Sequence, residues 1–242
     1  MSPRPFIVAI DGPAGAGKST ASRRLAARLG FAMVDTGAIY RAVALAATRL
    51  GIALDDDERL AGLLPGVDIR FAPPAVPGGG QRVLLGDEDV SEEIRTPPMS
   101  LGASKVSGRP VVRAGLLELQ RRLALAPGNA GAVLEGRDIG TVVFPDAEAK
   151  FFLTASPEER ARRRHAELVA KGDPQTFEQV LADQLRRDRD DSERAVAPLK
   201  PADDATVVDS TAVSLDEVVE RLAREVAERL RARAGGRRSG AP

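Results

Sequence analysis

The chain has 242 residues, enough for one sizeable hydrophobic core with small additions to it. Its 35 basic and 35 acidic side chains cancel, which argues against bulk binding of nucleic acid or anionic lipid, and the absence of cysteine excludes disulfides and cysteine metal sites. The N-terminal apolar run is too short for a signal peptide, and no segment approaches the ~20 apolar residues of a membrane span. We therefore expect a cytoplasmic protein with no membrane or nucleic-acid partner, and we expect it to act as a monomer.

Apolar runs rich in β-branched residues predict five strands, at 6–11, 31–36, 132–136, 149–154 and 205–210. Stretches with helical spacing lie between and after them, which is typical of a doubly wound parallel sheet with helices on both faces. Two segments carry the pattern of a helix start, Ser156 with Glu159 and Ser214 with Glu217. The predicted fold class is therefore α/β, with a five-stranded parallel sheet in a single domain over 1–242.

Three regions depart from this alternation. Residues 63–103 contain VDIRF and RVLLGDEDVS around the cluster APPAVPGGG, which predicts a small antiparallel β insert; we assign its 73–81 loop no role. Residues 156–200 are densely charged and helical, and their composition fits either a solvated helix pair or a lid that faces a ligand. The final segment, 235–242, reads GGRRSGAP and is expected to be a disordered tail.

The stretch GPAGAGKST at 12–20 follows the first predicted strand and begins a predicted helix. It matches the phosphate-binding P-loop pattern G-x-x-x-x-G-K-[ST]. Glycines let backbone amides wrap around phosphate oxygens, and the helix N-terminus adds a partial positive charge. We expect Lys18 to reach the β- and γ-phosphates of ATP, and the Ser19 hydroxyl to hold Mg²⁺. The predicted ATP-binding loop comprises Gly12, Pro13, Ala14, Gly15, Ala16, Gly17, Lys18, Ser19 and Thr20.

A P-loop does not by itself separate a small-molecule kinase from a nucleotide-dependent switch. A switch would carry a guanine-reading N-K-x-D segment, but the nearest match, AKGD at 170–173, has Ala170 in place of the asparagine. An aspartic protease would need two copies of the D-T-G pattern that occurs once here, at Asp35. The kinase hypothesis explains more of the chain, because polar side chains follow the second and third predicted strands, where ligands of such sheets gather.

At these residues the sequence resembles the bacterial cytidylate kinase family. The resemblance rests on IDGPAGAGKST at 10–20, VDTGAIYRA at 34–42, EGRDIGTVVFPDA at 135–147 and ERAVAPL at 193–199. It covers nearly the whole chain, including GDEDVSEEIRT in the insert. It implies a nucleoside monophosphate kinase fold with an acceptor-binding insert and a mobile lid. It also implies transfer of a phosphoryl group from ATP to CMP or dCMP, with Mg²⁺.

The resemblance also implies a role for individual residues. Around the acceptor phosphate it places Thr36, Arg41 and Arg137, near the cytosine Ser104, Arg113 and Asp138, and near the ribose Arg187 and Asp191. Arg194 is implied to lie close to both nucleotides, and the lid residues Arg160 and Arg164 to approach the ATP phosphates on closure. The catalytic set would be Lys18, Arg41, Arg137 and Arg194.

Other polar residues receive weaker interpretations. Glu135, at the end of a strand, has two open roles: it orders the water shell of Mg²⁺, or it pairs with an arginine. Tyr40 either packs or lines the acceptor pocket, and His165 is assigned no chemistry. We expect mostly surface ion pairs from Arg186, Asp188, Arg189 and Asp190.

Overall fold

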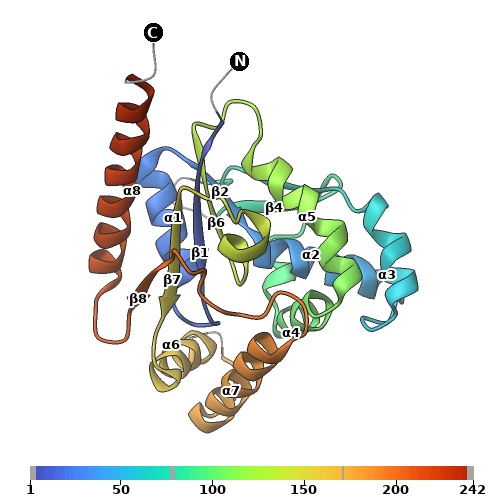
Figure 1. Ribbon diagram of the computed structural model, residues 1–242. Helices are drawn as coiled ribbons and strands as arrows, with labels where there is room; N and C mark the ends of the chain where they lie inside the picture. The colour runs from blue at the N-terminus through green and yellow to red at the C-terminus, as the bar shows by residue number, and fades with distance from the viewer. Residues whose placement is uncertain (1–3, 77–79, 171, 239–242) are drawn as a thin grey trace. The chain divides into compact units, whose positions relative to one another are not determined.

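The computed structural model describes residues 4–76, 80–170 and 172–238 (Figure 1). The chain forms two compact units, one made of Met1–Met33 with Leu123–Pro242 and the other of Val34–Arg122. Three parts of the sequence predictions lie outside the described residues: the tip of the 73–81 loop at 77–79, position 171 of the AKGD segment, and 239–242 of the predicted tail.

A five-stranded sheet confirms the predicted strands to within one residue at each end. The strands are β1 (Phe6–Asp11), β2 (Ala32–Asp35), β6 (Gly131–Gly136), β7 (Ala149–Thr154) and β8 (Thr206–Asp209). Their order is β2-β6-β1-β7-β8, and β1 pairs in parallel with both β6 and β7. The chain runs from β1 to one edge and later crosses to the other, so β1 lies where the strand order reverses. Ligands of open α/β sheets bind at that point, beyond the carboxyl ends of the strands.

The core of the first unit follows from its apolar strands. Every residue of β1 and β6 is buried, which suits central strands that carry almost no polar side chain. Figure 1 shows α1 (Lys18–Leu29) and α8 (Leu215–Arg238) side by side, and Leu25 of α1 and Leu222 of α8 join the same apolar cluster as the strands. These two helices therefore bury their apolar stripes against the sheet.

The helix α8 differs from the prediction of a disordered tail at 235–242. It continues through Arg238, so residues 235–238 are helical and not part of a disordered tail. With 24 residues it is the longest helix in the described part of the chain, yet no described helix is apolar enough over a sufficient length to span a membrane.

The predicted lid region forms two helices, α6 (Pro157–Val169) and α7 (Phe177–Glu193), which lie side by side in Figure 1. Ser156 caps α6 as predicted, since its Oγ accepts a hydrogen bond from the Glu159 amide at 3.2 Å. A reciprocal capping box of Thr176 and Gln179 begins α7 and was not predicted. The helices share a small apolar cluster of Ala161, Leu168 and Val180.

The second unit contains the predicted insert. Its antiparallel sheet has the order β3-β4-β5, made of β3 (Ile69–Ala72), β4 (Arg82–Leu85) and β5 (Glu88–Asp89). Around it lie α2 (Thr36–Arg49), α3 (Asp57–Leu63), η1 (Leu64–Gly66), η2 (Glu93–Arg95), α4 (Pro97–Ser107) and α5 (Pro110–Ala124). At Gly102 of α4, an added Cβ would lie 3.0 Å from the Ala44 side chain, so α2 and α4 pack closely because this position has no side chain.

Candidate active site

The P-loop joins β1 to α1 and depends on its glycines. Gly12 has a φ of 146°, and a Cβ at this position would lie 1.9 Å from the Leu153 carbonyl oxygen, so no other residue fits there. Gly17, with φ of 86°, turns the chain into α1. The loop therefore has the form that phosphate binding requires, with Lys18 as the first residue of the helix.

Lys18 is buried, and its Nζ donates a hydrogen bond of 2.7 Å to the Pro13 carbonyl. Burial, and secondarily the positive charge of Arg137, lower the pKa of Lys18 to about 7, against the opposing effect of Glu135 and Asp11. A lysine in this condition gains from a nearby anion, because an anion favours its charged form. An anion bound here would therefore raise the pKa of Lys18.

Several residues predicted to bind CMP come together beside the loop, in the same unit. Arg137, which follows β6, donates from Nε to Oδ2 of Asp191 on α7 at 2.8 Å. Burial opposes ionisation of Asp191, but Arg137, Arg194 and Arg187 together hold the pKa of this carboxyl below its usual value. Burial and the charge of Arg137 also lower the pKa of Arg187. Three arginines thus gather around one carboxylate, that of Asp191.

Arg194 belongs to the same cluster. Its Nη1 lies 3.9 Å from Oδ1 of Asp191, and its Nε donates to the Ala197 carbonyl. Ala197 has a φ of 51°, the one left-handed non-glycine residue in the described chain. Such a conformation is disfavoured for alanine and persists only where its surroundings hold it. The turn that begins at Arg194 is thus held in a strained form that fixes the arginine head group.

Arg160, which the resemblance implies would approach the ATP phosphates on closure of the lid, is buried and binds protein groups in the structure. It donates to the Ala14 carbonyl of the P-loop at 3.1 Å, and to both carboxylate oxygens of Asp188 at 3.1 and 2.6 Å. Asp188, one of the residues expected mostly in surface ion pairs, is half-buried and joins α7 to α6 through this pair. The second lid arginine, Arg164, pairs with Glu167 near the surface.

Two further contacts join the lid helices to the P-loop, and the sequence analysis missed both. The Gln184 amide lies where a Cβ on Gly15 would approach it to 2.9 Å. Arg163 donates to Oγ and the carbonyl of Ser210, at 3.1 and 2.6 Å, and the Ser210 hydroxyl donates to the Ala16 carbonyl at 3.3 Å. The lid thus packs directly on the backbone that is expected to hold ATP.

The second unit holds the predicted acceptor residues Thr36, Arg41, Ser104 and Arg113, whereas Asp138 follows β6 in the first unit and is buried. Asp35 caps α2 by accepting from the Ala38 amide at 2.8 Å, and it pairs with Arg41 at 3.1 Å. The Arg41 Nε is buried and has no hydrogen-bond partner in the described protein. Thr36, the first residue of α2, is buried. No pattern in the sequence indicates that Asp35 orients Arg41, since an acid at a helix start is explained by capping alone.

Arg113 and Ser104, two of the residues predicted to lie near the cytosine, belong to this unit. The Arg113 guanidinium lies 5.8 Å from the centre of the Tyr40 ring and donates to the Ser107 carbonyl at 3.1 Å. Tyr40 is buried, which favours packing as its role. Ser104 lies on α4 and is half-buried, and its carbonyl accepts from the Ser107 hydroxyl.

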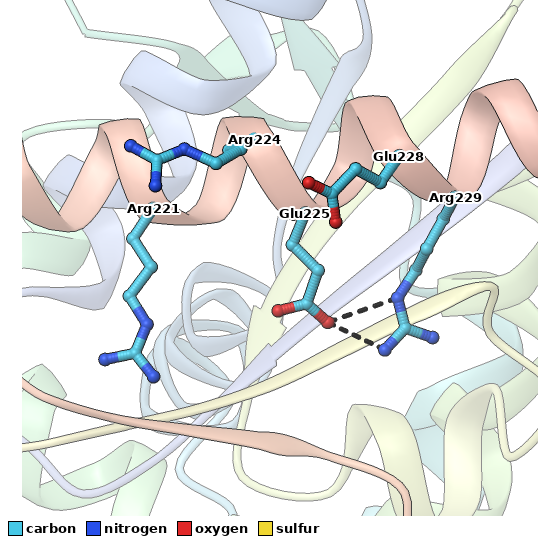
Figure 2. A pocket seen from close by; sticks show the side chains of 5 residues that line it. All are labelled: Arg221, Arg224, Glu225, Glu228 and Arg229. Carbon is cyan, nitrogen blue, oxygen red and sulfur yellow. Dashed lines mark hydrogen bonds and ion pairs between the residues drawn. The ribbon is translucent and has the colours of Figure 1, made fainter.

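A surface hollow lies along α8 and has a different character (Figure 2). It is lined by Arg221, Arg224, Glu225, Glu228 and Arg229. In it Glu225 accepts from Nε and Nη2 of Arg229 at 3.1 and 2.7 Å, a pairing expected for residues four apart on one helix. All five residues belong to that helix and none belongs to a predicted site, so we assign the hollow no part in catalysis.

Comparison with known proteins agrees with this geometry. The family model described as cytidylate kinase matches residues 8–228. The chain belongs to the cytidylate kinase family. A cytidylate kinase of a Geobacter species is 55% identical over 224 residues, which cover 93% of this chain and 94% of that protein. The cytidylate kinase of Geobacter sulfurreducens is 53% identical over 232 residues, covering 96% and 97% of the two chains.

Among solved structures, an uncharacterized protein of Eubacterium ventriosum superposes with a TM-score of 0.50 at 10% identity, covering 92% of this chain and 98% of that one. A likeness at this identity shows the fold alone. The family and the α/β fold that the sequence predicts are both confirmed.

Proposed function

We propose that this chain transfers the terminal phosphoryl group of ATP to CMP, giving ADP and CDP. The observation that carries the proposal is the crowding of cationic side chains beside an intact P-loop. Lys18 and Arg187 both have a lowered pKa, for the shared reasons of burial and proximity to Arg137. Phosphate groups relieve that crowding, and the cytidylate kinases that this chain resembles support CMP as the acceptor.

The acceptor phosphate is itself an anionic nucleophile, so the reaction needs no general base. Catalysis then consists of alignment and charge neutralisation. We assign Lys18 to the ATP phosphates, and Arg41 and Arg137 to the acceptor phosphate, because a guanidinium binds two phosphate oxygens at once. The buried, unpartnered Nε of Arg41 supports this role. Arg194, held by its turn, would contact both nucleotides.

The residues present fit Mg²⁺ as an ion held mainly by ATP. In the described part of the chain no three His, Cys, Asp or Glu side chains form a metal cluster. Mg²⁺ bound to nucleotide needs only one or two protein ligands, since phosphates and water supply the rest. We assign the exposed Ser19 hydroxyl to it, and Glu135 either to its water shell or to Lys18, whose charge it favours. When bound, the ion neutralises charge on the phosphate oxygens.

Base recognition is the finer part of the proposal. Cytosine offers an amino donor at N4 and acceptors at N3 and O2, whereas uracil has a donor at N3 and an acceptor at O4. A carboxylate at Asp138 with donors at Ser104 and Arg113 complements cytosine. We assign the ribose to Arg187 and Asp191, and we propose that dCMP is also accepted. We propose further that the enzyme is a cytoplasmic monomer.

The test is a coupled ADP-release assay against all ribo- and deoxyribonucleoside monophosphates. CMP is expected to give the highest kcat/KM, and Asp138→Ala is expected to lower the CMP-to-UMP ratio about tenfold, since good base recognition contributes ~1 to 3 kcal/mol. A nucleotide-dependent switch would hydrolyse ATP slowly and ignore the acceptor. A preference for AMP or UMP would leave only a general nucleotide kinase, and no response to any monophosphate would indicate another small-molecule kinase.

A further inference from the structure

Asp11 is a buried carboxylate that the P-loop pattern does not include. It ends β1, immediately before Gly12, and is only 4% exposed. Its Oδ1 accepts from the Ile139 amide and its Oδ2 from the Gly140 amide, both at 2.8 Å. From this geometry we infer that Asp11 is a positioning residue, which holds the turn carrying Arg137 and Asp138 in the form that binds the acceptor nucleotide. The inference rests on the proposed CMP kinase function.

The turn needs support because it leads into a rare structure. Asp138 is followed by η3 (Ile139–Val143), a π-helical turn in which the Phe144 amide donates to the Ile139 carbonyl at 2.7 Å. The first amides of any helix have no partner within it. Here a carboxylate 128 residues earlier in the chain accepts two of them. Asp11 thereby ties the strand before the P-loop to the residues assigned to CMP.

The position of Asp11 is costly for folding. Burial raises its pKa to about 6, against the opposing effect of the Gly140 and Ile139 amides. Among neighbouring charges Asp138 raises this pKa further and Lys18 lowers it, and the aliphatic part of the Lys150 side chain also lies beside Gly140. At neutral pH the folded protein therefore keeps a charge that burial disfavours. The two amide hydrogen bonds oppose this cost, and they hold the carboxylate beside the turn that carries Arg137 and Asp138.

The sequence carried one sign of this role. Asp11 is the only charged residue in the run FIVAID, which is otherwise a fully apolar central strand. A lone acid at the carboxyl end of such a strand stands where ligands of α/β sheets bind. Only the structure shows that its partners are backbone amides and not a ligand.

The first test is Asp11→Asn, which keeps the shape but places an amide group against an amide donor. We expect kcat/KM for CMP to fall about tenfold, equivalent to about 1.4 kcal/mol, the size of one lost hydrogen bond. The Kd of a non-hydrolysable ATP analogue should change less than about threefold, because the P-loop keeps its own bonds. Asp146→Asn is the control: this exposed partner of Arg4 should alter neither quantity.

A second variant perturbs the same contact from the opposite side and decides the question if Asp11→Asn does not fold. Gly140→Ala adds a Cβ 3.4 Å from Oδ2 of Asp11 and 3.2 Å from Lys150 Cδ. It should likewise lower kcat/KM for CMP while changing the Kd of the ATP analogue much less. Gly62→Ala is the control, because no atom lies within 4 Å of the added carbon.

The outcomes separate this inference from the proposed function. If the wild-type enzyme phosphorylates CMP and the folded variants leave CMP efficiency unchanged, the role of Asp11 is rejected. It is also rejected if analogue affinity falls as far as CMP efficiency, since Asp11 would then support the P-loop alone. A wild-type enzyme that does not phosphorylate CMP would instead overturn the proposed function, which the wild-type assay shows before any variant is made.

Discussion

The P-loop and the lid helices α6 and α7 are both assigned to phosphate binding, but they are built differently. The P-loop is one continuous segment in which glycine conformations set the backbone and a single lysine supplies the charge. The lid has no comparable motif. Its arginines are oriented one by one, Arg160 by Asp188 and Arg194 by the Ala197 carbonyl. A site built from backbone depends on few partners, whereas a site built from long side chains depends on every group that orients them. The lid should therefore be sensitive to changes at residues that never touch a nucleotide.

The largest effect is expected at the P-loop lysine. Lys18→Ala should lower kcat by on the order of 10³-fold, because it removes the cation assigned to the transferred phosphate. The fold should persist, since among the described residues the Lys18 side chain donates to the Pro13 carbonyl of its own loop. Turnover is measured by coupled ADP release and folding by circular dichroism. Near wild-type turnover would rule out the kinase assignment.

The next-largest effect distinguishes the two-pronged geometry of a guanidinium group from its positive charge alone. Arg137→Lys and Arg41→Lys should each lower kcat/KM for CMP by about 10²-fold, although the charge remains, because an ammonium group cannot bind two phosphate oxygens in one plane. Arg162→Lys provides the control, because Arg162 is exposed on α6 and pairs only along its own helix. A fully active lysine variant at position 137 or 41 would show that the residue is not a phosphate clamp.

The dependence of the lid on the partners of its arginines can be tested directly at Asp188. Asp188→Asn leaves the buried Arg160 without its carboxylate, and breaking such a pair is expected to lower the free energy of unfolding by about 3 kcal/mol. Asp183→Asn, which breaks an exposed pair with Arg186 on the same helix, should change it by less than about 1 kcal/mol. Urea unfolding of both variants checks the difference. Equal stabilities would mean that the lid does not depend on this pair.

Because the pKa of Lys18 is lowered, both stability and phosphate binding at the P-loop are expected to be coupled to protonation of this lysine. Its folded pKa of about 7 lies below the ordinary value of 10.5, so the unfolded chain binds this proton first, and the free energy of unfolding decreases as pH falls from 10.5 to 7. At pH 8 the free enzyme therefore holds Lys18 mostly neutral, and a bound phosphate should restore the proton. Calorimetry of ATP-analogue binding in buffers of different ionisation enthalpy should show uptake of close to one proton, which Lys18→Met abolishes. Absence of uptake in the wild type would contradict the lowered pKa.

The smallest effect concerns motion of the lid. Closing over both substrates excludes water from the transferred group, so hydrogen exchange in residues 156–195 should slow when a bisubstrate analogue binds. Because Arg160 already bonds to the P-loop, the first turn of α6 should change less than the end of α7 near Arg194. Identical protection with and without ligand would favour the alternative of a solvated helix pair.

The sequence by itself determined the parts of this protein that depend on near neighbours. Strand ends, the P-loop, the Ser156 cap and the antiparallel insert all follow from residues a few positions apart, since φ preferences and local hydrogen bonds act at that range. Tertiary structure decided which side chains meet. Asp11 and Ile139 are 128 positions apart, Arg137 and Asp191 are 54 apart, and Arg160 and Asp188 are 28 apart. Residues 235–238 are likewise helical because they continue the long helix α8, which their own local sequence does not predict. A buried charged side chain pairs with the complementary group that lies next to it in the packed fold. No pattern along the chain specifies that group.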